Sequence, residues 1–310
     1  MARKITHYTS HITHHTPVFA VILVGGKGKR LRPLSTDSRP KAFLPITRDG
    51  HTMFRITLDR IKKIIPGENI IVVANKLHAS LVRKDFPNMD TSNLLLEPVS
   101  RNTAPAITLA ASSLKKRFGD AIMVVLASDQ YIEGEGLYLD SIKNGVGFVK
   151  RNLPALLALG IRPTHPEAGL GYIKIQNPKS KIQNKSKIYK AKSFVEKPNP
   201  GMAKRFIDDG NYLWNAGAFI FSAGSLLKAV KKFSPEIFNP LSDPDKIRDV
   251  YKRLPDISID YAVMERAGNI YCMECAYGWK DMGSFDALEE VLKKEGLSYA
   301  SSGLKYDGVL

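Results

Sequence analysis

Residues 20–35 read Ala-Val-Ile-Leu-Val-Gly-Gly-Lys-Gly-Lys-Arg-Leu-Arg-Pro-Leu-Ser, an apolar run that passes directly into a basic, glycine-rich turn. The run reaches back to Val18, and its β-branched residues predict a buried strand over Val18–Val24. The turn's glycines (Gly25, Gly26, Gly28) let backbone N–H groups approach an anion, and Lys29 and Arg30 supply compensating charge. The spacing matches neither the Walker nor the dinucleotide pattern. We therefore expect a phosphate-bearing small molecule at this turn.

Further short apolar runs alternate with helical patterns along the chain. Apolar residues spaced for one helix face predict a helix over Thr52–Ile65, and Thr103 followed by Pro105 is typical of the cap of a helix running to about Arg117. This alternation indicates an open α/β sheet whose ligands bind beyond the carboxyl ends of its strands. The other expected strands are Ile70–Ala74, Ala121–Ala127, Ala155–Leu159, Tyr172–Ile175, Ile188–Val195, Gly217–Ser222 and Ile270–Ala276.

The expected fold class is α/β, a Rossmann-like open mixed sheet with helices on both faces, plus a substrate-binding lobe built by the second half. We expect a flexible tail over residues 1–16, one domain over 17–296 with halves 17–135 and 136–296, and a C-terminal tail over 297–310. Four histidines of the N-terminal tail (His7, His11, His14, His15) are interpreted as part of a polar tail and not as a metal tract.

Composition excludes several classes of protein. With 44% hydrophobic and 25% charged residues, the 310-residue chain is typical of a globular protein and not of a disordered one. No apolar run approaches the roughly 20 residues that cross a bilayer, and the polar start lacks the apolar core of a secretory signal. The lone pair Cys272 and Cys275 predicts buried thiols in a cytoplasmic strand. We therefore expect a cytoplasmic protein with no membrane partner.

The net charge of +16 raises the question of a nucleic-acid partner. Seven of the lysines lie between Lys174 and Ser193, a segment without acids that favours a solvated loop or hairpin extension. Other basic residues cluster at the glycine-rich turn. This distribution favours a phosphorylated small molecule over a nucleic acid.

Six segments of the chain carry recognisable motifs, in this order: Gly25-Gly-Lys-Gly-Lys-Arg-Leu-Arg-Pro-Leu34 with Arg39-Pro-Lys41, Glu97-Pro-Val-Ser-Arg-Asn-Thr-Ala-Pro-Ala106, Phe194-Val-Glu-Lys-Pro198, Trp214-Asn-Ala-Gly217, Ser258-Ile-Asp-Tyr-Ala-Val-Met-Glu265 and Gly278-Trp-Lys-Asp-Met-Gly-Ser284. Together they resemble the motifs of the sugar-1-phosphate nucleotidyltransferases and, within them, the mannose-1-phosphate guanylyltransferases. The resemblance covers roughly Val18 to Val291.

The resemblance implies the nucleotide-diphospho-sugar transferase fold and transfer of GMP from GTP to mannose 1-phosphate. Such a transfer needs positioning and charge neutralisation. Arg30 and Lys41 are expected to stabilise phosphate charge, and Asp129, with Asp281 from the other half, to hold Mg²⁺. Longer relatives also carry an isomerase domain, whose activity we expect this chain to lack. The assembly state is left open, with a homodimer as one option.

Substrate contacts are expected from two further groups of residues. Glu97 is the candidate reader of the guanine edge. The residues after it either contact the nucleotide or, for Asn102 or Thr103, cap the following helix. The nucleotide group is Gly25, Gly26, Gly28, Lys29, Glu97, Arg101, Asn102 and Thr103, and the sugar-phosphate group is Gly171, Glu196, Lys197 and Asn215.

Three alternatives stay open at this point. One keeps the reaction class and changes the substrates, for example to UTP or dTTP with glucose 1-phosphate. A second is a non-catalytic paralogue that binds a nucleotide sugar and regulates a partner. A third is a nucleic-acid-binding protein, which predicts a steep dependence of affinity on salt.

Overall fold

The computed structural model describes residues 16–26, 28–176, 187–299 and 304. The histidines of the expected N-terminal tail and Lys27 lie outside these residues, as does the middle of the lysine-rich segment. Within the described residues, the strands are β1 Val18–Val24, β2 Ile70–Asn75, β3 Leu94–Glu97, β4 Ile122–Ala127, β5 Gln130–Glu133, β6 Leu156–Ile161, β7 Tyr172–Ile175, β8 Ile188–Val195, β9 Tyr212–Ser222, β10 Ile270–Cys275 and β11 Gly278–Asp281.

The α-helices lie mostly between these strands, as the alternating sequence predicts. They are α1 Met53–Lys62, α2 Ala79–Asp85, α3 Thr103–Phe118, α4 Glu135–Arg151, α5 Pro200–Asp209, α6 Ala223–Phe233, α7 Pro235–Leu241, α8 Ile247–Val250 and α9 Phe285–Lys294. In the described part of the chain, no helix is both long and apolar enough to span a membrane.

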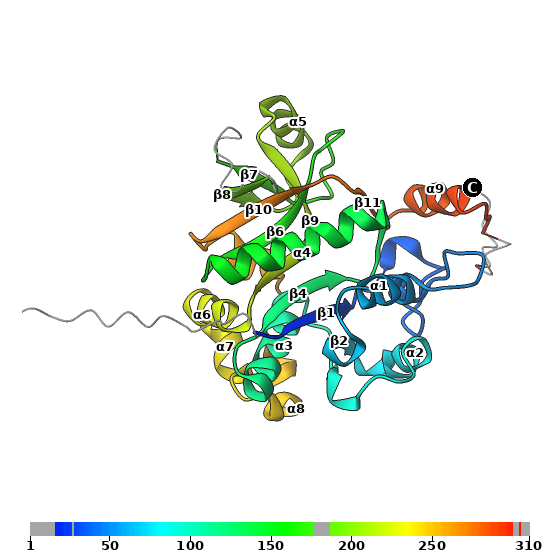
Figure 1. Cartoon of the computed structure of the whole chain (residues 1–310). Coiled ribbons are helices and arrows are strands. Elements are labelled where there is room, and N and C mark those ends of the chain that lie inside the picture. Colours follow the sequence, from blue (N-terminus) through cyan, green and yellow to red (C-terminus); the bar gives the residue numbers. More distant parts are fainter. Residues whose placement is uncertain (1–15, 27, 177–186, 300–303, 305–310) are drawn as a thin grey trace, which may run out of the picture.

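One large mixed sheet runs through both halves of the chain, in the order β3-β2-β1-β4-β9-β6-β10-β8-β7, with β9 also paired to β7. β1 is parallel to β2 and β4, whereas β9 is antiparallel to both β4 and β6. Because β9 lies between β4 and β6, the two halves share one sheet (Figure 1). The expected open mixed sheet is confirmed.

Helices cover both faces of the sheet because β1 is apolar on both. Ala20, Ile22 and Val24 belong to the core that contains residues of α1, α2 and α4. Phe19 and Val21 alternate with them and belong to the core that contains residues of α3, α6 and α7. Continuous apolar character in place of strict alternation is typical of a strand buried on both faces.

Several element boundaries differ from those expected. α1 begins one residue after Thr52, whose side chain caps it by accepting from the Arg55 N–H. The cap of α3 is Asn102 and not Thr103, because the side-chain oxygen Oδ1 of Asn102 accepts from the Thr103 N–H at 2.9 Å. β9 begins at Tyr212, five residues before the expected Gly217. Of the two options for the lysine-rich segment, a loop or a hairpin, the antiparallel pairing of β7 and β8 favours the hairpin, whose tip lies outside the described residues.

Two smaller features complete the described fold. β5 and β11 form a separate two-stranded sheet in which Asp281 lies opposite Gln130. A third core packs α9 against the segment after the glycine-rich turn, with Leu31, Met282 and Leu304 among its buried residues.

Cys272 and Cys275 are buried free thiols on β10, as expected.

Candidate active site

The glycine-rich turn lies at the carboxyl end of β1, at the sheet edge where ligands of open α/β folds bind. Gly26 and Gly28 have positive φ angles of 96° and 53°, which side chains rarely adopt. A Cβ on Gly28 would also lie 3.2 Å from the Lys41 Cβ. The glycines therefore let the turn fold closely over Lys41. The backbone of Lys29 opens a short 3-10 turn, and its side chain lies outside the described part.

Lys41 lies between the two carboxylates that the sequence assigned to a metal. Its Nζ is 2.8 Å from Asp129 Oδ2 and 3.6 Å from Asp281 Oδ1. Burial alone would lower the pKa of Lys41, but the two carboxylates more than offset it, and the pKa lies above its ordinary value. Lys41 therefore stays charged, at 8% side-chain exposure against 24% for Asp129.

Lys41, Asp129 and Asp281 lie close together because strands from both halves of the chain pair beside them. Asp129 follows β4, and Asp281 ends β11, which pairs with the strand directly after Asp129. Arg30 NH2 lies 3.7 Å from Asp281 Oδ2. A Cβ on Gly283 would come within 2.4 Å of that guanidinium and 2.5 Å of Asp281 Oδ2, so a larger residue there would displace this pair. The third core holds the neighbours Leu31 and Met282 together and thereby fixes both loops.

A cavity of about 570 Å³ opens beside this cluster, within the range typical of small-molecule sites. It extends from the glycine-rich turn to the start of α3 and is lined by both apolar and polar side chains. The residues of the expected site that line it are Gly25, Gly26, Glu97, Asn102, Thr103 and Asp129.

Glu97 lies in the wall of this cavity but is 5% exposed. The Tyr251 hydroxyl donates to Glu97 Oε1, and the Arg101 backbone also binds the carboxylate. Burial nevertheless raises the pKa of Glu97 to about 7, against an ordinary 4.5. The carboxyl group therefore already has hydrogen-bond partners within the protein. That it also accepts hydrogen bonds from the guanine edge stays a prediction.

The three residues expected after Glu97 have different positions. Arg101 donates to the Lys252 carbonyl oxygen and is not among the side chains that line the cavity. The Thr103 hydroxyl accepts from the Ile259 N–H at 2.9 Å, which ties the start of α3 to a distant segment of the second half. Asn102 caps α3 with a φ of 64°. The cap interpretation of Asn102 is confirmed, and contact with a nucleotide remains untested.

The four residues expected to bind the sugar phosphate lie together, where β7, β8 and β9 meet. Lys197 Nζ is 3.0 Å from Glu196 Oε1, and the Asn215 N–H donates to the Gly171 carbonyl oxygen at 2.8 Å. A Cβ on Gly171 would lie 2.4 Å from Glu196 Oε2. Gly171 thus permits the close approach of the Glu196 carboxylate.

Asp260 is a candidate site residue that the sequence analysis did not select. It accepts from Asn215 Nδ2 at 2.8 Å and lines the same cavity as Asp129. Burial first, and then the nearby Glu196 carboxylate, raise the pKa of Asp260 to about 6. Its segment was among the six that carry the resemblance, which was the available signal.

A second cavity of about 680 Å³ lies on the other side of Asp281 and is lined by Arg30, Trp214 and Trp279. Both indole N–H groups are buried without a hydrogen-bond partner among the described residues. Buried indole N–H groups usually have a partner, so these two are free to donate to a ligand. Trp214 is 5% exposed, so it packs in the core and also lines this cavity.

Residues 19–296 match the model of the nucleotidyl transferase family. The chain belongs to this family. It is 35% identical to a mannose-1-phosphate guanylyltransferase of Escherichia coli over 93% of the chain and 64% of the relative. It is 36% identical to a putative mannose-1-phosphate guanylyltransferase of Vibrio cholerae over 89% of the chain and 60% of the relative. The chain therefore spans less than two thirds of the length of these relatives.

A solved structure from Thermus thermophilus, described as a mannose-1-phosphate geranyltransferase, superposes with a TM-score of 0.80. It shares 31% identity, over 89% of this chain and 79% of its own. A putative glucose-1-phosphate thymidylyltransferase from Bacillus anthracis has the same fold, with a TM-score of 0.59 at 20% identity. The fold is thus that of nucleotidyltransferases.

Proposed function

We propose that this protein transfers GMP from GTP to α-D-mannose 1-phosphate, giving GDP-mannose and pyrophosphate. The observation that carries the proposal is the charged cluster of Lys41, Asp129 and Asp281 beside a nucleotide-sized cavity. The names of the E. coli and V. cholerae relatives support the choice of substrates.

The reaction is an in-line displacement. A phosphate oxygen of the sugar phosphate forms a bond to the α-phosphorus of GTP, the bond from that phosphorus to the β-phosphate oxygen breaks, and pyrophosphate leaves with the electron pair. Lys41, charged and buried, would neutralise the α-phosphate, and Arg30, which is mostly exposed, would reach the departing pyrophosphate. Lys197 would pair with the sugar's phosphate, and Glu196 would accept from its hydroxyls.

We propose Mg²⁺ as the cofactor. Mg²⁺ in nucleotide sites is held by one or two carboxylates plus substrate phosphates, and Asp129 and Asp281 fit because both lie within 4 Å of one ammonium and are partly exposed. No group of three or more potential protein ligands occurs among the described residues, so substrate oxygens would have to complete the site. When bound, the metal would withdraw charge from the phosphates.

The deciding experiment is release of pyrophosphate from GTP, ATP, UTP, CTP and dTTP in turn, each with mannose 1-phosphate or glucose 1-phosphate and Mg²⁺. We expect turnover with GTP and mannose 1-phosphate only, and its loss in Asp129→Asn. Turnover with UTP or dTTP and glucose 1-phosphate would replace the substrates and keep the class. No release with any pair, together with binding of GDP-mannose, would favour the regulatory paralogue.

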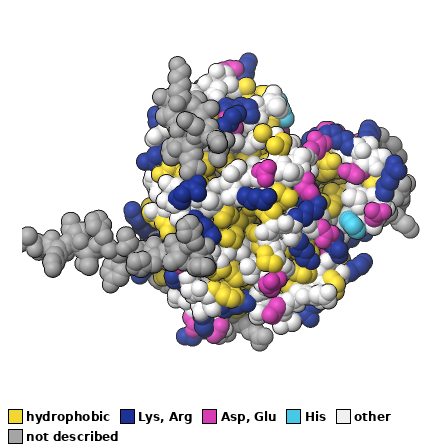
Figure 2. Space-filling view, in the orientation of Figure 1, with side chains coloured by type: hydrophobic (Ala, Val, Ile, Leu, Met, Phe, Trp, Pro, Cys, Tyr) yellow, Lys and Arg dark blue, Asp and Glu magenta, His cyan; other side chains and the backbone are white. Residues whose placement is uncertain are grey.

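Charge distribution gives little support to a nucleic-acid partner. On the face shown in Figure 2, Lys and Arg side chains are interspersed with Asp and Glu and do not form one continuous patch. Binding of a duplex oligonucleotide that weakens steeply with salt would contradict this interpretation.

We also propose a cytoplasmic location, supported by the two buried free thiols, Cys272 and Cys275.

A further inference from the structure

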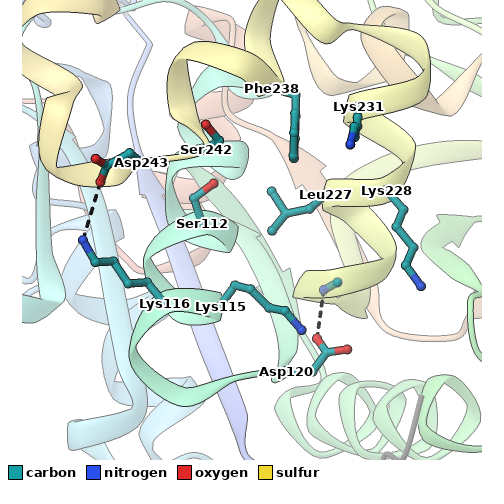
Figure 3. A pocket seen from close by; sticks show the side chains of 11 residues that line it. Ser112, Lys115, Lys116, Asp120, Leu227, Lys228, Lys231, Phe238, Ser242 and Asp243 are labelled. Atoms are coloured by element: carbon teal, nitrogen blue, oxygen red, sulfur yellow. Dashed lines mark hydrogen bonds and ion pairs between the residues drawn. The ribbon is translucent and has the colours of Figure 1, made fainter. Parts of the chain in front are cut away.

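A third cavity, of about 610 Å³, lies between α3, α6 and the end of α7, away from the candidate active site (Figure 3). Three exposed lysines line it, Lys115 from α3 and Lys228 and Lys231 from α6. Its apolar part consists of Leu227 and Phe238. None of these residues has a role in the function proposed above.

The cavity lies at the opposite end of the sheet from the catalytic groups. Its residue Asp120 lies two residues before the start of β4, whereas Asp129 lies two residues after the end of that strand. A strand of this length spans about 20 Å. Likewise, the nucleotide cavity contacts the first turn of α3 and this one contacts the last turns, about 14 Å further along the helix axis.

The balance of charge in the cavity favours an anion. Lys116 is paired with Asp245 at 2.5 Å and with Asp243 at 3.5 Å. Asp120 accepts from the Gly224 N–H at 2.8 Å and from the Ala121 N–H at 3.1 Å, so its charge already caps the start of α6. Across the described part of the chain, Lys115, Lys228 and Lys231 have no ion pair.

A buried hydroxyl independently points to a ligand. Ser112 is 5% exposed and lines the cavity, yet its Oγ has no hydrogen-bond partner among the described residues. A serine or threonine inside a helix usually donates to the carbonyl four residues earlier, as Thr108 of the same helix does to Ala104 at 2.7 Å. An unpaired buried hydroxyl destabilises the protein, and a ligand oxygen that accepts from it would remove that cost.

We propose that this cavity is a second binding site, which takes a small organic phosphate. Ammonium groups bind phosphate well as point charges, and three of them beside a free hydroxyl suit its several oxygens. Leu227 and Phe238 supply a surface for a ring or another apolar part of the ligand. Lys231 Nζ already lies 5.6 Å from the centre of the Phe238 ring, so charge and apolar surface are adjacent.

The test uses phenyl phosphate as the probe, because it joins one phosphate to one ring. Calorimetric titration measures its affinity, and hydrogen exchange shows which segments it protects. We expect protection of 112–120 and of α6, and affinity that falls as salt is added. Inorganic phosphate should bind at least about tenfold more weakly, and benzyl alcohol not measurably.

The variants are Lys228→Met with Lys231→Met, and separately Ser112→Ala. Lys204→Met, an exposed lysine on α5, is the matched control. We expect the affinity for phenyl phosphate to fall at least about tenfold in the double variant and severalfold in Ser112→Ala. The control should keep the wild-type affinity, and all variants should keep the wild-type melting temperature. Unchanged affinity in the double variant would overturn the proposal. So would protection confined to 25–35 and 97–103 at the catalytic edge, or equal affinity for inorganic phosphate.

Discussion

At the scale of single residues, Lys41 holds together two carboxylates that would otherwise repel each other. Its ammonium lies within 4 Å of both Asp129 and Asp281. If a divalent cation were held by these two carboxylates, the lysine would be free to move toward a phosphate. One residue would thus stabilise the site without substrate and neutralise the substrate once it binds.

Replacing Lys41 with methionine tests this double role. We expect pyrophosphate release to fall at least about a hundredfold, because a buried cation at the phosphates is lost. Unfolding free energy should fall by about 1–3 kcal/mol, less than for a fully buried pair because the carboxylates are partly exposed.

The distinguishing measurement is the melting temperature with and without Mg²⁺. In Lys41→Met the two carboxylates lack their counter-charge, so millimolar Mg²⁺ should raise the melting temperature more than in the wild type. Equal shifts in both proteins would show that the carboxylates do not form a cation site.

The raised pKa of Glu97 predicts that the stability of the folded protein depends on pH. Its pKa is raised from 4.5 to about 7 in the folded protein by burial, so between these values the unfolded chain has lost a proton that the folded one retains. The contribution of Glu97 to stability is therefore fully present below about pH 4.5, declines as pH rises, and is lost above about pH 7.

The matched variant is Glu97→Gln, whose amide oxygen can still accept from Tyr251. We expect the free energy of unfolding of the variant, measured in denaturant and relative to that of the wild type, to rise by about 2–3 kcal/mol between pH 4.5 and 8. A difference that stays constant across this range would contradict the raised pKa.

At the scale of elements, the sugar-phosphate group depends on how closely the segment before β7 approaches the end of β8. Gly171→Ala would place a methyl group against the Glu196 carboxylate, without a positive φ to complicate the change. We expect the KM for mannose 1-phosphate to rise about tenfold, with a small change in the KM for GTP. Gly136→Ala, where a Cβ meets nothing within 4 Å, is the control.

Two variants of Asn102, at the start of α3, distinguish its role as a helix cap from a contact with the nucleotide. Asn102→Ala removes the cap and places alanine at a φ of 64°, so unfolding free energy should fall by about 1–2 kcal/mol. Asn102→Gly tolerates that φ and should cost only a few tenths of a kcal/mol. If the glycine variant keeps its stability but its KM for GTP rises tenfold, Asn102 contacts the nucleotide as well.

How much the sequence predicted differs from element to element. β1, β7 and β8 have the bounds expected from their apolar patterns, because each pattern is bounded by turn residues. β5 and β11 were not predicted, since four-residue strands of mostly intermediate burial carry no clear pattern. The sugar-phosphate residues were expected as a group, but the ion pairs of Lys41 depend on long-range packing that no local pattern encodes.

At the scale of the whole molecule, the shared sheet predicts that the two halves unfold together. β9 pairs with β4 of the first half and with β6 and β7 of the second, and the core on each face contains residues of both halves. Separating the halves would expose the edges of β4 and β9 and break both cores. We therefore expect one cooperative transition in denaturant, unlike many chains of this length.

Two probes make this a sharp test. Trp214 and Trp279 both belong to the second half, and Trp279 lies opposite Ile132 of β5, so tryptophan fluorescence reports that half and its contact with β5. Far-ultraviolet circular dichroism also reports α1 to α3 of the first half. Coincident curves with one midpoint are expected, and Asp129→Asn, at a partly exposed carboxylate, serves as a control that should keep them coincident. A fluorescence midpoint clearly below that of circular dichroism would mean that the second half unfolds first, and that the pairing of β9 with β4 does not hold the molecule together.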